Sequence, residues 1–266
     1  MPSTRPEAFA TKAEIKRLKA LLRERRTRDE EGVFVCEGPR VIEAALEHGV
    51  ELVECFVGAD VTAEIRAVAD RVAASGVRVR VFDDYPGARV GDTATPQPVF
   101  AVAAMRRCGP EALAGTDLAL VATRLGDPGN AGTLMRSAAA AGAQVIVLGR
   151  GSVDAYNPKV VRASAGACFA VRVVEGRTAV EILEALGAEG VSCLGAIASG
   201  GAPPETFDLR APTAFVLGHE TEGLDSDLPL DGAVTLPMQA GESLNVAMAG
   251  TALLFEASRQ RRATSQ

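Results

Sequence analysis

The 266-residue sequence contains no tryptophan and only two histidines, and aromatic residues make up 4% of the chain. His48 and His219 alone give little from which to build a histidine-rich metal site or a Ser-His-Asp hydrolase. The five cysteines are an odd number without close spacing, which favours reduced, mostly buried thiols over zinc ligands or a disulfide framework. We therefore expect no metal site.

Long apolar runs and nucleotide-binding glycine motifs are also missing. The longest apolar runs are far shorter than the ~20 residues of a membrane span, and the N-terminus lacks the apolar segment of a signal peptide. We therefore expect a cytoplasmic protein without a membrane partner. The chain has neither G-x-G-x-x-G nor G-x-x-x-x-G-K-[ST], which argues against a dinucleotide or nucleoside triphosphate site.

The residues that are present predict two α/β domains. Hydrophobic residues make up 47% of the chain and charged residues 23%, which is typical of a globular protein with a core. Strand and helix patterns alternate over residues 1–105, a charged segment with Gly and Pro follows at 106–116, and the alternation restarts over 117–266. We expect a smaller α/β domain, a linker, and a mostly parallel sheet with helices on both faces. Such sheets bind ligands at the carboxyl ends of their strands.

Positive charge is concentrated near the N-terminus, although the net charge of the chain is −6. The segment 12–28 contains eight basic and two acidic residues, and Ile15, Leu18 and Leu22 within it have helical spacing. We expect an amphipathic helix with outward basic side chains that can bind phosphate, although a solvated helix face would show the same pattern. The candidates are Lys12, Lys16, Arg17, Lys19, Arg23, Arg25, Arg26 and Arg28.

The stretch "DPGNAGTLMRSAAAAG" predicts a turn followed by a helix of small residues. Asn130 is placed to cap that helix, and Arg136 is the only charged residue between Asp127 and Arg150. The alanines and glycines of this helix predict close contact with another element. Arg136 therefore suggests a functional site, although an arginine that reaches back to solvent remains the alternative.

Two further loops follow predicted strands. In "FVLGHETEGLDSDL", Gly218 ends an apolar strand and Glu220 comes two residues later. In "LPMQAGESLNVAMAGTALLFEASRQR", Ser243 is the expected N-cap of a helix that is apolar until Glu256, so we expect this helix to be buried. Ser243 and Asn245 would then lie where a ligand binds, although helix capping alone explains either residue.

Taken together, these three segments resemble the SpoU family of SPOUT RNA methyltransferases, over about residues 117–260. The segment "DAYNPKVVRASAGACF" resembles the region between the first two motifs of this family, and "FVCEGPRVIEAAL" resembles its substrate-binding domain. The resemblance implies transfer of a methyl group from S-adenosylmethionine to a ribose 2′-hydroxyl of RNA. It also implies a trefoil-knot fold and a homodimer formed through the C-terminal domain.

The same resemblance assigns roles to individual residues. It implies that Arg136 holds an RNA phosphate beside the reactive ribose, that Asn130 orients Arg136 or the ribose, and that Glu220 tethers a basic partner or a loop. Ser243 and Asn245 would shape the pocket around the methyl group and the hydroxyl. The implied cofactor-binding residues are Leu217, Gly218, Leu236, Met238 and Leu244.

With this resemblance, the basic segment becomes a candidate RNA-binding surface, which Lys159 and Arg162 would extend unless their helix simply faces solvent. Ribosomal RNA is the expected substrate, ahead of transfer RNA. One alternative is an inactive RNA-binding protein of the same fold that acts in ribosome assembly. A Rossmann-type oxidoreductase or nucleotide-binding enzyme is a more remote alternative, because its glycine fingerprint is missing.

Overall fold

The computed structural model describes residues 8–83, 97–241 and 243–263. The chain divides into two compact units, which are Met1–Arg106 with Tyr156–Phe169, and Arg107–Ala155 with Ala170–Gln266. The sequence pattern did not predict that Tyr156–Phe169 groups with the first unit. Among the described helices, none combines the length and the apolar character needed to cross a membrane.

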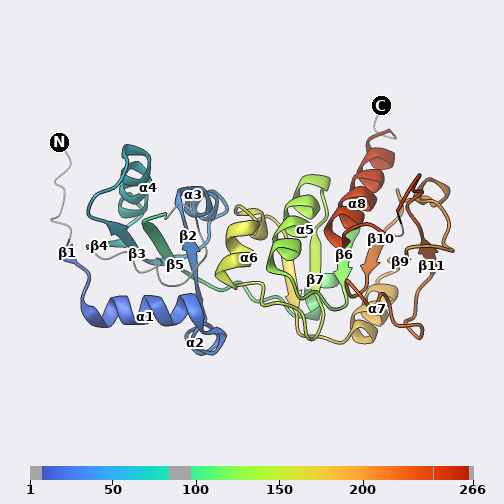
Figure 1. Ribbon diagram of the computed structural model, residues 1–266, viewed down its shortest axis with the longest axis horizontal. Helices are drawn as coiled ribbons and strands as arrows, with labels where there is room; N and C mark the ends of the chain where they lie inside the picture. Colours follow the sequence, from blue (N-terminus) through green and yellow to red (C-terminus); the bar gives the residue numbers. More distant parts are fainter. Residues whose placement is uncertain (1–7, 84–96, 242, 264–266) are drawn as a thin grey trace. The chain divides into compact units, whose positions relative to one another are not determined.

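The first unit is built on a mixed sheet of five described strands (Figure 1). Three neighbouring strands run parallel, and β5 is antiparallel to the strand on either side of it. In spatial order the strands are β1 (Ala8–Phe9), β4 (Arg78–Phe82), β3 (Leu52–Gly58), β5 (Val99–Ala104) and β2 (Val33–Glu37).

Helices cover both faces of this sheet. Helix α1 (Lys12–Arg23) buries Leu18, Leu21 and Leu22 against one face. Alternate residues of the strands point to the opposite face, where they form a second core with three other helices. These helices are α3 (Pro39–Glu47), α4 (Ala63–Ala74) and α6 (Pro158–Ala163).

The basic segment forms two helices instead of the expected single one. Helix α1 begins with a capping box in which Thr11 and Glu14 satisfy each other's backbone N–H groups. It ends at Glu24, whose extended backbone (φ −112°, ψ 112°) interrupts the helical path. Helix α2 (Arg25–Glu31) then ends at Gly32, whose left-handed conformation (φ 66°) favours glycine.

The second unit contains six described strands, all parallel, as the alternating sequence pattern predicted. Their spatial order is β11 (Gly232–Val234), β9 (Ser192–Ala196), β10 (Thr213–Leu217), β6 (Leu118–Ala122), β7 (Val145–Leu148) and β8 (Arg172–Glu175).

Two segments contain short helices that the sequence pattern did not predict. Residues 167–169 of the first unit form a 3-10 helix, and strand β8 of the second unit starts at Arg172. The predicted linker, residues 106–116, contains the 3-10 helix Pro110–Leu113, whose Leu113 is buried in the core of the second unit.

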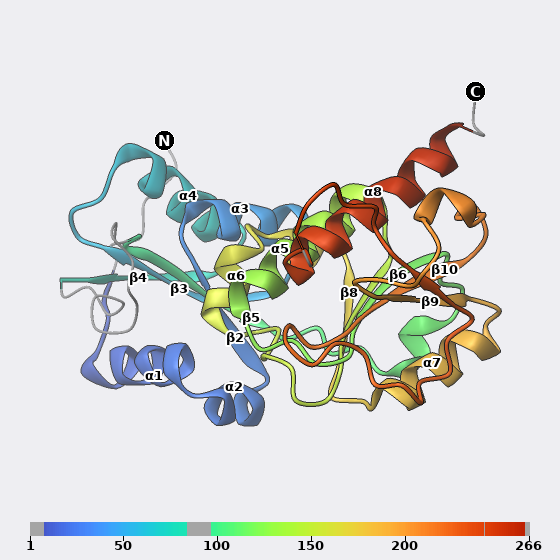
Figure 2. The same ribbon diagram turned by 45° about the vertical axis from the view of Figure 1, so that its right-hand side comes forward.

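Small residues allow the helices of the second unit to approach each other closely. Helices α5 (Pro128–Ala141) and α8 (Val246–Ala263) lie together on one face of the sheet, opposite α7 (Ala179–Ala188) (Figure 2). A Cβ atom on Gly250 of α8 would lie 2.6 Å from Leu134 Cδ2 and 2.9 Å from Leu217 Cδ1. The close contact expected from the glycines and alanines of α5 is thus made with α8.

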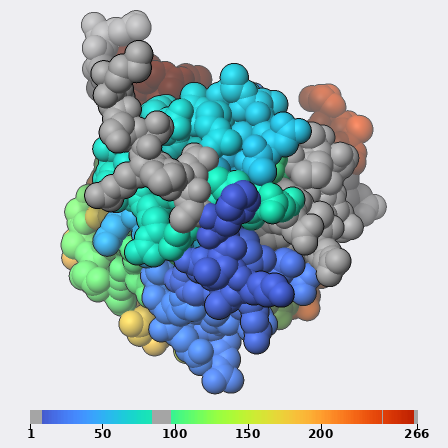
Figure 3. Space-filling view, turned by 90° about the vertical axis from the view of Figure 1, so that its left-hand side faces the viewer, coloured from blue at the N-terminus to red at the C-terminus, as the bar shows by residue number. Residues whose placement is uncertain are grey.

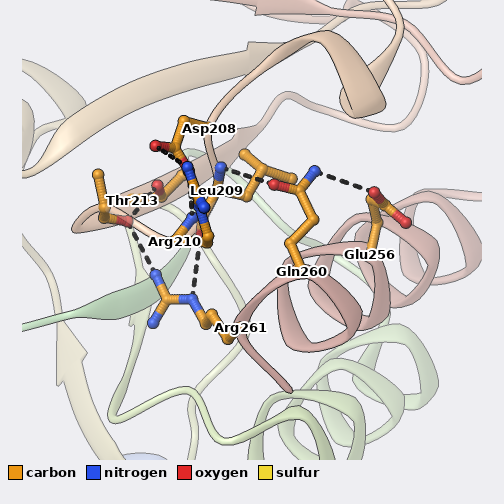
Figure 4. Close-up of polar contacts among 8 residues, drawn as sticks. Asp208, Leu209, Arg210, Thr213, Glu256, Gln260 and Arg261 are labelled. Carbon is orange, nitrogen blue, oxygen red and sulfur yellow. Dashed lines mark hydrogen bonds and ion pairs between the residues drawn. The ribbon is translucent and has the colours of Figure 1, made fainter. Parts of the chain in front are cut away.

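Polar contacts hold the C-terminal end of α8 (Figure 4). The Gln260 side chain accepts a hydrogen bond from the backbone N–H of Leu209 at 3.0 Å. Arg261 donates to the carbonyl oxygens of Leu209 and Ala211, each at 2.9 Å, and forms an ion pair with Asp117. Because a guanidinium near a helix C-terminus also interacts favourably with the helix dipole, Arg261 fixes this end of α8.

Candidate active site

A cavity of about 270 Å³ lies at the carboxyl ends of β9, β10 and β11 and beside the start of α8. The position agrees with the rule that parallel sheets bind ligands at the carboxyl ends of their strands. All five residues predicted to bind the cofactor line this cavity, namely Leu217, Gly218, Leu236, Met238 and Leu244. Glu220 and Ser243 line it as well.

The loop after β10 is a tight turn that requires its two glycines. The backbones of His219 and Gly223 exchange two hydrogen bonds, of 2.9 and 3.0 Å. A Cβ atom on Gly218 would lie 2.2 Å from the backbone of Gly223, and Gly223 has a φ of 75°. The space beside Gly218 is therefore filled by the returning chain, and the turn fixes the position of Glu220 between the two glycines.

A chain of side-chain hydrogen bonds connects Glu220, Asn130 and Asn245. The Asn245 amide donates to Asn130 Oδ1 at 3.2 Å, and the Asn130 amide donates to Glu220 Oε1 at 3.4 Å. Asn245 Oδ1 accepts from the backbone N–H groups of Ala247 and Met248 at the start of α8. Each amide therefore has one orientation, and no described residue accepts from the second N–H of either NH₂ group, which suits it to a ligand.

The caps of α5 and α8 differ from those expected. Asp127, not Asn130, caps α5, and its side chain accepts from the Asn130 backbone N–H at 2.7 Å. Asn245, not Ser243, caps α8, which begins at Val246. These corrections free the side chains of Asn130 and Ser243 from capping.

Arg136 lies away from the connected amides. The side chain is exposed, and no described residue forms a hydrogen bond or an ion pair with it. Six residues of an α-helix turn about 600° and rise about 9 Å, so Asn130 and Arg136 point roughly 120° apart around α5. The structure therefore does not bring Arg136 into contact with Asn130, and the cationic group is left available to an external anion.

The sequence interpretation missed part of the cavity wall. Ile197 and Ala198 line the cavity directly after β9, and His219 and Thr221 line it within the β10 loop. The His219 ring and the Thr221 hydroxyl are hydrogen-bonded at 3.0 Å. The sequence could have indicated Ile197 and Ala198, because they lie at the carboxyl end of a predicted strand. Segments at the carboxyl ends of parallel strands commonly contribute to the binding site.

The basic candidates near the N-terminus fall into two groups. Several arginines are paired within the protein, with Arg17 bound to Glu31 and Glu54, Arg25 to Asp29, and Arg26 to Glu30. Arg28 is only 2% exposed and donates to the carbonyl of Leu21, so it cannot contact RNA as predicted. Lys12, Lys16 and Lys19 form no hydrogen bond or ion pair with any described residue.

The two candidates on α6 also differ from each other. Arg162 forms an ion pair of 3.0 Å with Glu37, which is 7% exposed, so this arginine is committed to the packing of α6 on β2. Lys159 is exposed and has no partner among the described residues. Of the two, Lys159 is the better candidate for an external phosphate.

Comparison with protein families assigns the two halves of the sequence. Residues 117–255 match the model of the SpoU rRNA Methylase family, and residues 12–101 match the model of an MRM3-like substrate binding domain. The chain belongs to the SpoU rRNA methylase family. The RlmP protein of Bacillus subtilis, a 23S rRNA (guanosine(2553)-2′-O)-methyltransferase, is 33% identical to this SpoU protein over 238 residues, which cover 88% of this chain and 92% of RlmP.

Solved structures of two methyltransferases have the same fold. The SpoU methyltransferase AviRb from Streptomyces viridochromogenes, in complex with the cofactor AdoMet, superposes with a TM-score of 0.83 at 28% identity, over 94% of this chain and 99% of AviRb. An rRNA methyltransferase from Sinorhizobium meliloti gives a TM-score of 0.82 at 28% identity, over 95% of this chain and 97% of that protein.

The cavity of this SpoU protein fits S-adenosylmethionine in chemical character. Leucine and methionine side chains offer apolar surface for the purine, and the loops offer backbone groups for its polar edges. The backbone N–H groups of Leu236 and Met238 donate to no described residue, so both remain for a ligand. Glu220 adds a carboxylate to the wall of the cavity, which suits a cofactor that carries positive charge.

Proposed function

We propose that this SpoU protein transfers a methyl group from S-adenosylmethionine to a ribose 2′-hydroxyl of ribosomal RNA. The observation that carries the proposal is the series of side-chain hydrogen bonds Asn245–Asn130–Glu220. It connects two oriented amides to the wall of the cavity. Relatives named as 23S rRNA 2′-O-methyltransferases, including RlmP, support ribosomal RNA as the substrate.

The cofactor, when bound, supplies a methyl group activated by a positively charged sulfur. In our proposal Leu217, Gly218, Leu236, Met238 and Leu244 hold it through apolar contacts and backbone groups. The protein must then place the ribose oxygen in line with the methyl group, because a hydroxyl is a weak nucleophile and alignment lowers the barrier. The overall reaction yields a 2′-O-methyl ribose, S-adenosylhomocysteine and a proton.

The remaining N–H groups of Asn130 and Asn245 suit the positioning of the ribose. Both amides are fixed by their other hydrogen bonds, so they lose little freedom when they bind an oxygen of the sugar. Ser243 lies on the cavity wall and its hydroxyl adds a further donor or acceptor. Glu220, on the wall of the cavity, accepts the hydrogen bond from the Asn130 amide and so helps to hold both amides in place.

Arg136 is assigned to the RNA backbone. Its guanidinium offers a planar fork that matches a phosphate, and no described residue occupies it. A guanidinium carries five N–H donors and no acceptor site, which favours a phosphate-holding role over that of a base. In this role Arg136 fixes the position of the reactive ribose through its neighbouring phosphate.

We further propose a homodimer formed through the second unit. Helix α8, expected to be fully buried, leaves Met248 64% exposed and Phe255 42% exposed. These residues are seven apart and so share one face of the helix. Two exposed large apolar side chains on one helix face suit an isologous contact with a second copy. The trefoil knot, the domain boundaries 1–105, 106–116 and 117–266, and a cytoplasmic location remain predictions from the sequence.

A methyl-transfer assay tests the proposed function. The full-length protein is incubated with tritium-labelled S-adenosylmethionine and unmodified transcripts of 23S rRNA, with bulk tRNA as the alternative substrate. We expect label in 23S rRNA, and a site where the backbone resists alkaline hydrolysis because a methylated 2′-oxygen cannot attack the phosphate. Binding of cofactor and RNA without any transfer would support the assembly-factor alternative instead, and label on a base would contradict the proposal.

A further inference from the structure

One side of α1 carries a regular series of basic residues. Lys12, Lys16, Lys19 and Arg23 are separated by four, three and four positions, a spacing that aligns side chains along one side of a helix. All four line one groove of about 770 Å³ in the first unit. We call Lys12, Lys16 and Lys19 the lysine stripe.

Other residues of α1 hold the helix to its unit. Leu18, Leu21 and Leu22 are buried against the sheet. Glu14 forms an ion pair of 3.2 Å with Arg80 of β4, and Arg17 one of 3.4 Å with Glu54 of β3. Since both the apolar face and the ion-paired residues fix the rotation of α1, the lysine stripe has a fixed direction relative to the groove.

An aromatic ring lies in the same groove. Phe9 belongs to the short edge strand β1, two residues before the N-cap of α1, and is 62% exposed although it is large and apolar. Its strand pairs with β4 through the register Phe9–Val81, so the backbone at this position is fixed. In Figure 3, which looks onto the first unit, the dark-blue start of α1 lies at the molecular surface.

The charge of the groove favours an anionic polymer. Its lining includes four basic residues and two acidic ones, Glu24 and Asp83. The Glu24 carboxylate accepts a hydrogen bond of 2.8 Å from the Thr27 hydroxyl, and the basic residues of the lining still outnumber the acidic ones. A row of ammonium groups beside an exposed aromatic ring is the arrangement by which proteins bind single-stranded nucleic acid, with cations along the backbone and rings under the bases.

We propose that the lysine stripe binds successive phosphates of an RNA strand and that Phe9 stacks on an unpaired base of that strand. The proposal rests on the proposed function in so far as RNA is the substrate, and it restricts the RNA-binding part of the basic segment to one side of α1. In this proposal Arg17 and Arg28 are engaged in contacts between elements of the first unit, Arg25 and Arg26 pair with carboxylates within α2, and none of the four binds the RNA.

Charge-matched variants of the full-length protein test the stripe. K16Q/K19Q removes two stripe charges, and R40Q/R71Q removes two exposed charges from α3 and α4, on the opposite face of the same sheet. The probe is a fluorescein-labelled 15-nucleotide oligouridylate, titrated at several salt concentrations. Each lost phosphate contact lowers the salt slope by about 0.7, so we expect K16Q/K19Q to lower it by about 1.4 and to weaken binding about 10- to 50-fold at 0.1 M salt. R40Q/R71Q should leave the slope unchanged.

Variants at Phe9 test the stacking contact. Phe9→Leu keeps an apolar side chain but removes the ring, and Phe9→Trp keeps a ring. Because stacking on one base contributes about 1–3 kcal/mol, Phe9→Leu should weaken oligouridylate binding about 5- to 150-fold without changing the salt slope. Phe9→Trp should retain binding, and neither variant should affect binding of a blunt RNA duplex of the same length, in which all bases are paired.

The outcomes separate this proposal from the proposed function. An equal loss of affinity in K16Q/K19Q and R40Q/R71Q would overturn the stripe, and an equal loss in Phe9→Leu and Phe9→Trp would overturn the stacking. Either result leaves methyl transfer by the unaltered protein intact. Conversely, absence of methyl transfer together with the expected effects of the stripe variants would overturn the proposed function. The proposal that the lysine stripe and Phe9 bind RNA would still hold.

Discussion

The cores of the two units differ in how many large rings they contain. In the first unit, Phe34, Phe56 and Phe100 are almost fully buried between the sheet and the helices, whereas among the described residues of the second unit Phe215 is the one phenylalanine buried to this degree. In the second, Gly250 brings α8 against Leu134 and Leu217, and Ser137 on α5 is 2.6 Å from the Thr251 hydroxyl on α8. Large rings separate layers, whereas small residues let helix backbones approach each other.

This difference matches the chemistry that each unit presents. The second unit fixes two asparagine amides within hydrogen-bond distance of each other, which requires that the starts of α5 and α8 cannot shift. The first unit presents long flexible lysines, for which the direction of the helix matters more than the position of any single atom. Close packing thus accompanies the candidate catalytic residues, and charge patterning accompanies the candidate RNA surface.

The largest effect is expected at Arg136. Arg136→Lys keeps the charge but loses the planar fork, so we expect methyl transfer to fall by about 100-fold, the loss typical of misplaced reactants. Cofactor affinity should stay unchanged, because Arg136 does not line the cavity. Single-turnover methyl transfer and calorimetric titration with S-adenosylmethionine measure the two effects. Arg177→Lys, also exposed in the second unit, is the control, and near-normal turnover of Arg136→Lys would rule out the phosphate-holding role.

The next effect concerns the exposed face of α8. M248D/F255D should convert a dimer into a monomer in sedimentation velocity experiments, because two buried charges without partners oppose association. Val180→Asp places a charge on α7, on the other face of the sheet, and should not change the oligomeric state. A wild-type monomer at micromolar concentration would refute the proposed dimer.

A smaller effect tests the close packing of the second unit. Gly250→Val should lower the free energy of unfolding by about 1–3 kcal/mol, because the added carbons meet Leu134 and Leu217. Since Leu217 lines the cavity, cofactor affinity should fall as well. A Cβ atom on Gly187 of α7 would point into open space, with no packed neighbour within 4 Å, so Gly187→Val is the matched control. Equal stability of the Gly187→Val and Gly250→Val variants would contradict the packing argument.

The smallest effect is expected on helix stability, at the equivalent capping boxes of α1 and α7 in the two units. Hydrogen bonding to the Thr11 backbone lowers the pKa of Glu14 below its ordinary value of 4.5, and the Thr178 backbone lowers the pKa of Glu181 in the same way. A carboxylate with a lowered pKa stabilises the fold above pH 4.5, and this contribution is lost as the pH falls through the folded-state pKa. Glu14→Gln should therefore destabilise α1 by about 0.3–1.5 kcal/mol at pH 7 and by less at pH 3.

Hydrogen exchange of the backbone amides of α1 and α7 measures the loss of helix stability in the variants Glu14→Gln and Glu181→Gln. Glu181→Gln should have the smaller effect, because Glu14 also pairs with Arg80. If Glu14→Gln lowered the protection of α1 from hydrogen exchange equally at pH 3 and pH 7, the ionised form of Glu14 would not contribute to the stability of α1.

Several features of the site could be predicted from the sequence because they depend on local order. The alternating pattern predicted the parallel sheet, and the ends of its strands identified the loops that carry Gly218, Glu220 and Ser243. The errors were of another kind. Asn130 was predicted as a cap and Arg28 as an outward cation, whereas Asp127 caps α5 and Arg28 is buried. The cap of α5 depends on the competition between Asp127 and Asn130, and the burial of Arg28 depends on the break between α1 and α2 at Glu24. Residue type alone reveals neither.

By itself, the sequence determined most of the alternation of strands and helices, the family, and the candidate residues for methyl transfer, because periodicity and short motifs are local properties of the chain. Only the tertiary structure decided that α6 packs on β2 in the first unit, that Asn130 bonds to Asn245 across 115 positions, and which side of α1 remains open. These outcomes depend on which surfaces meet in space, and contacts between distant segments follow from packing of the whole chain, not from local preference.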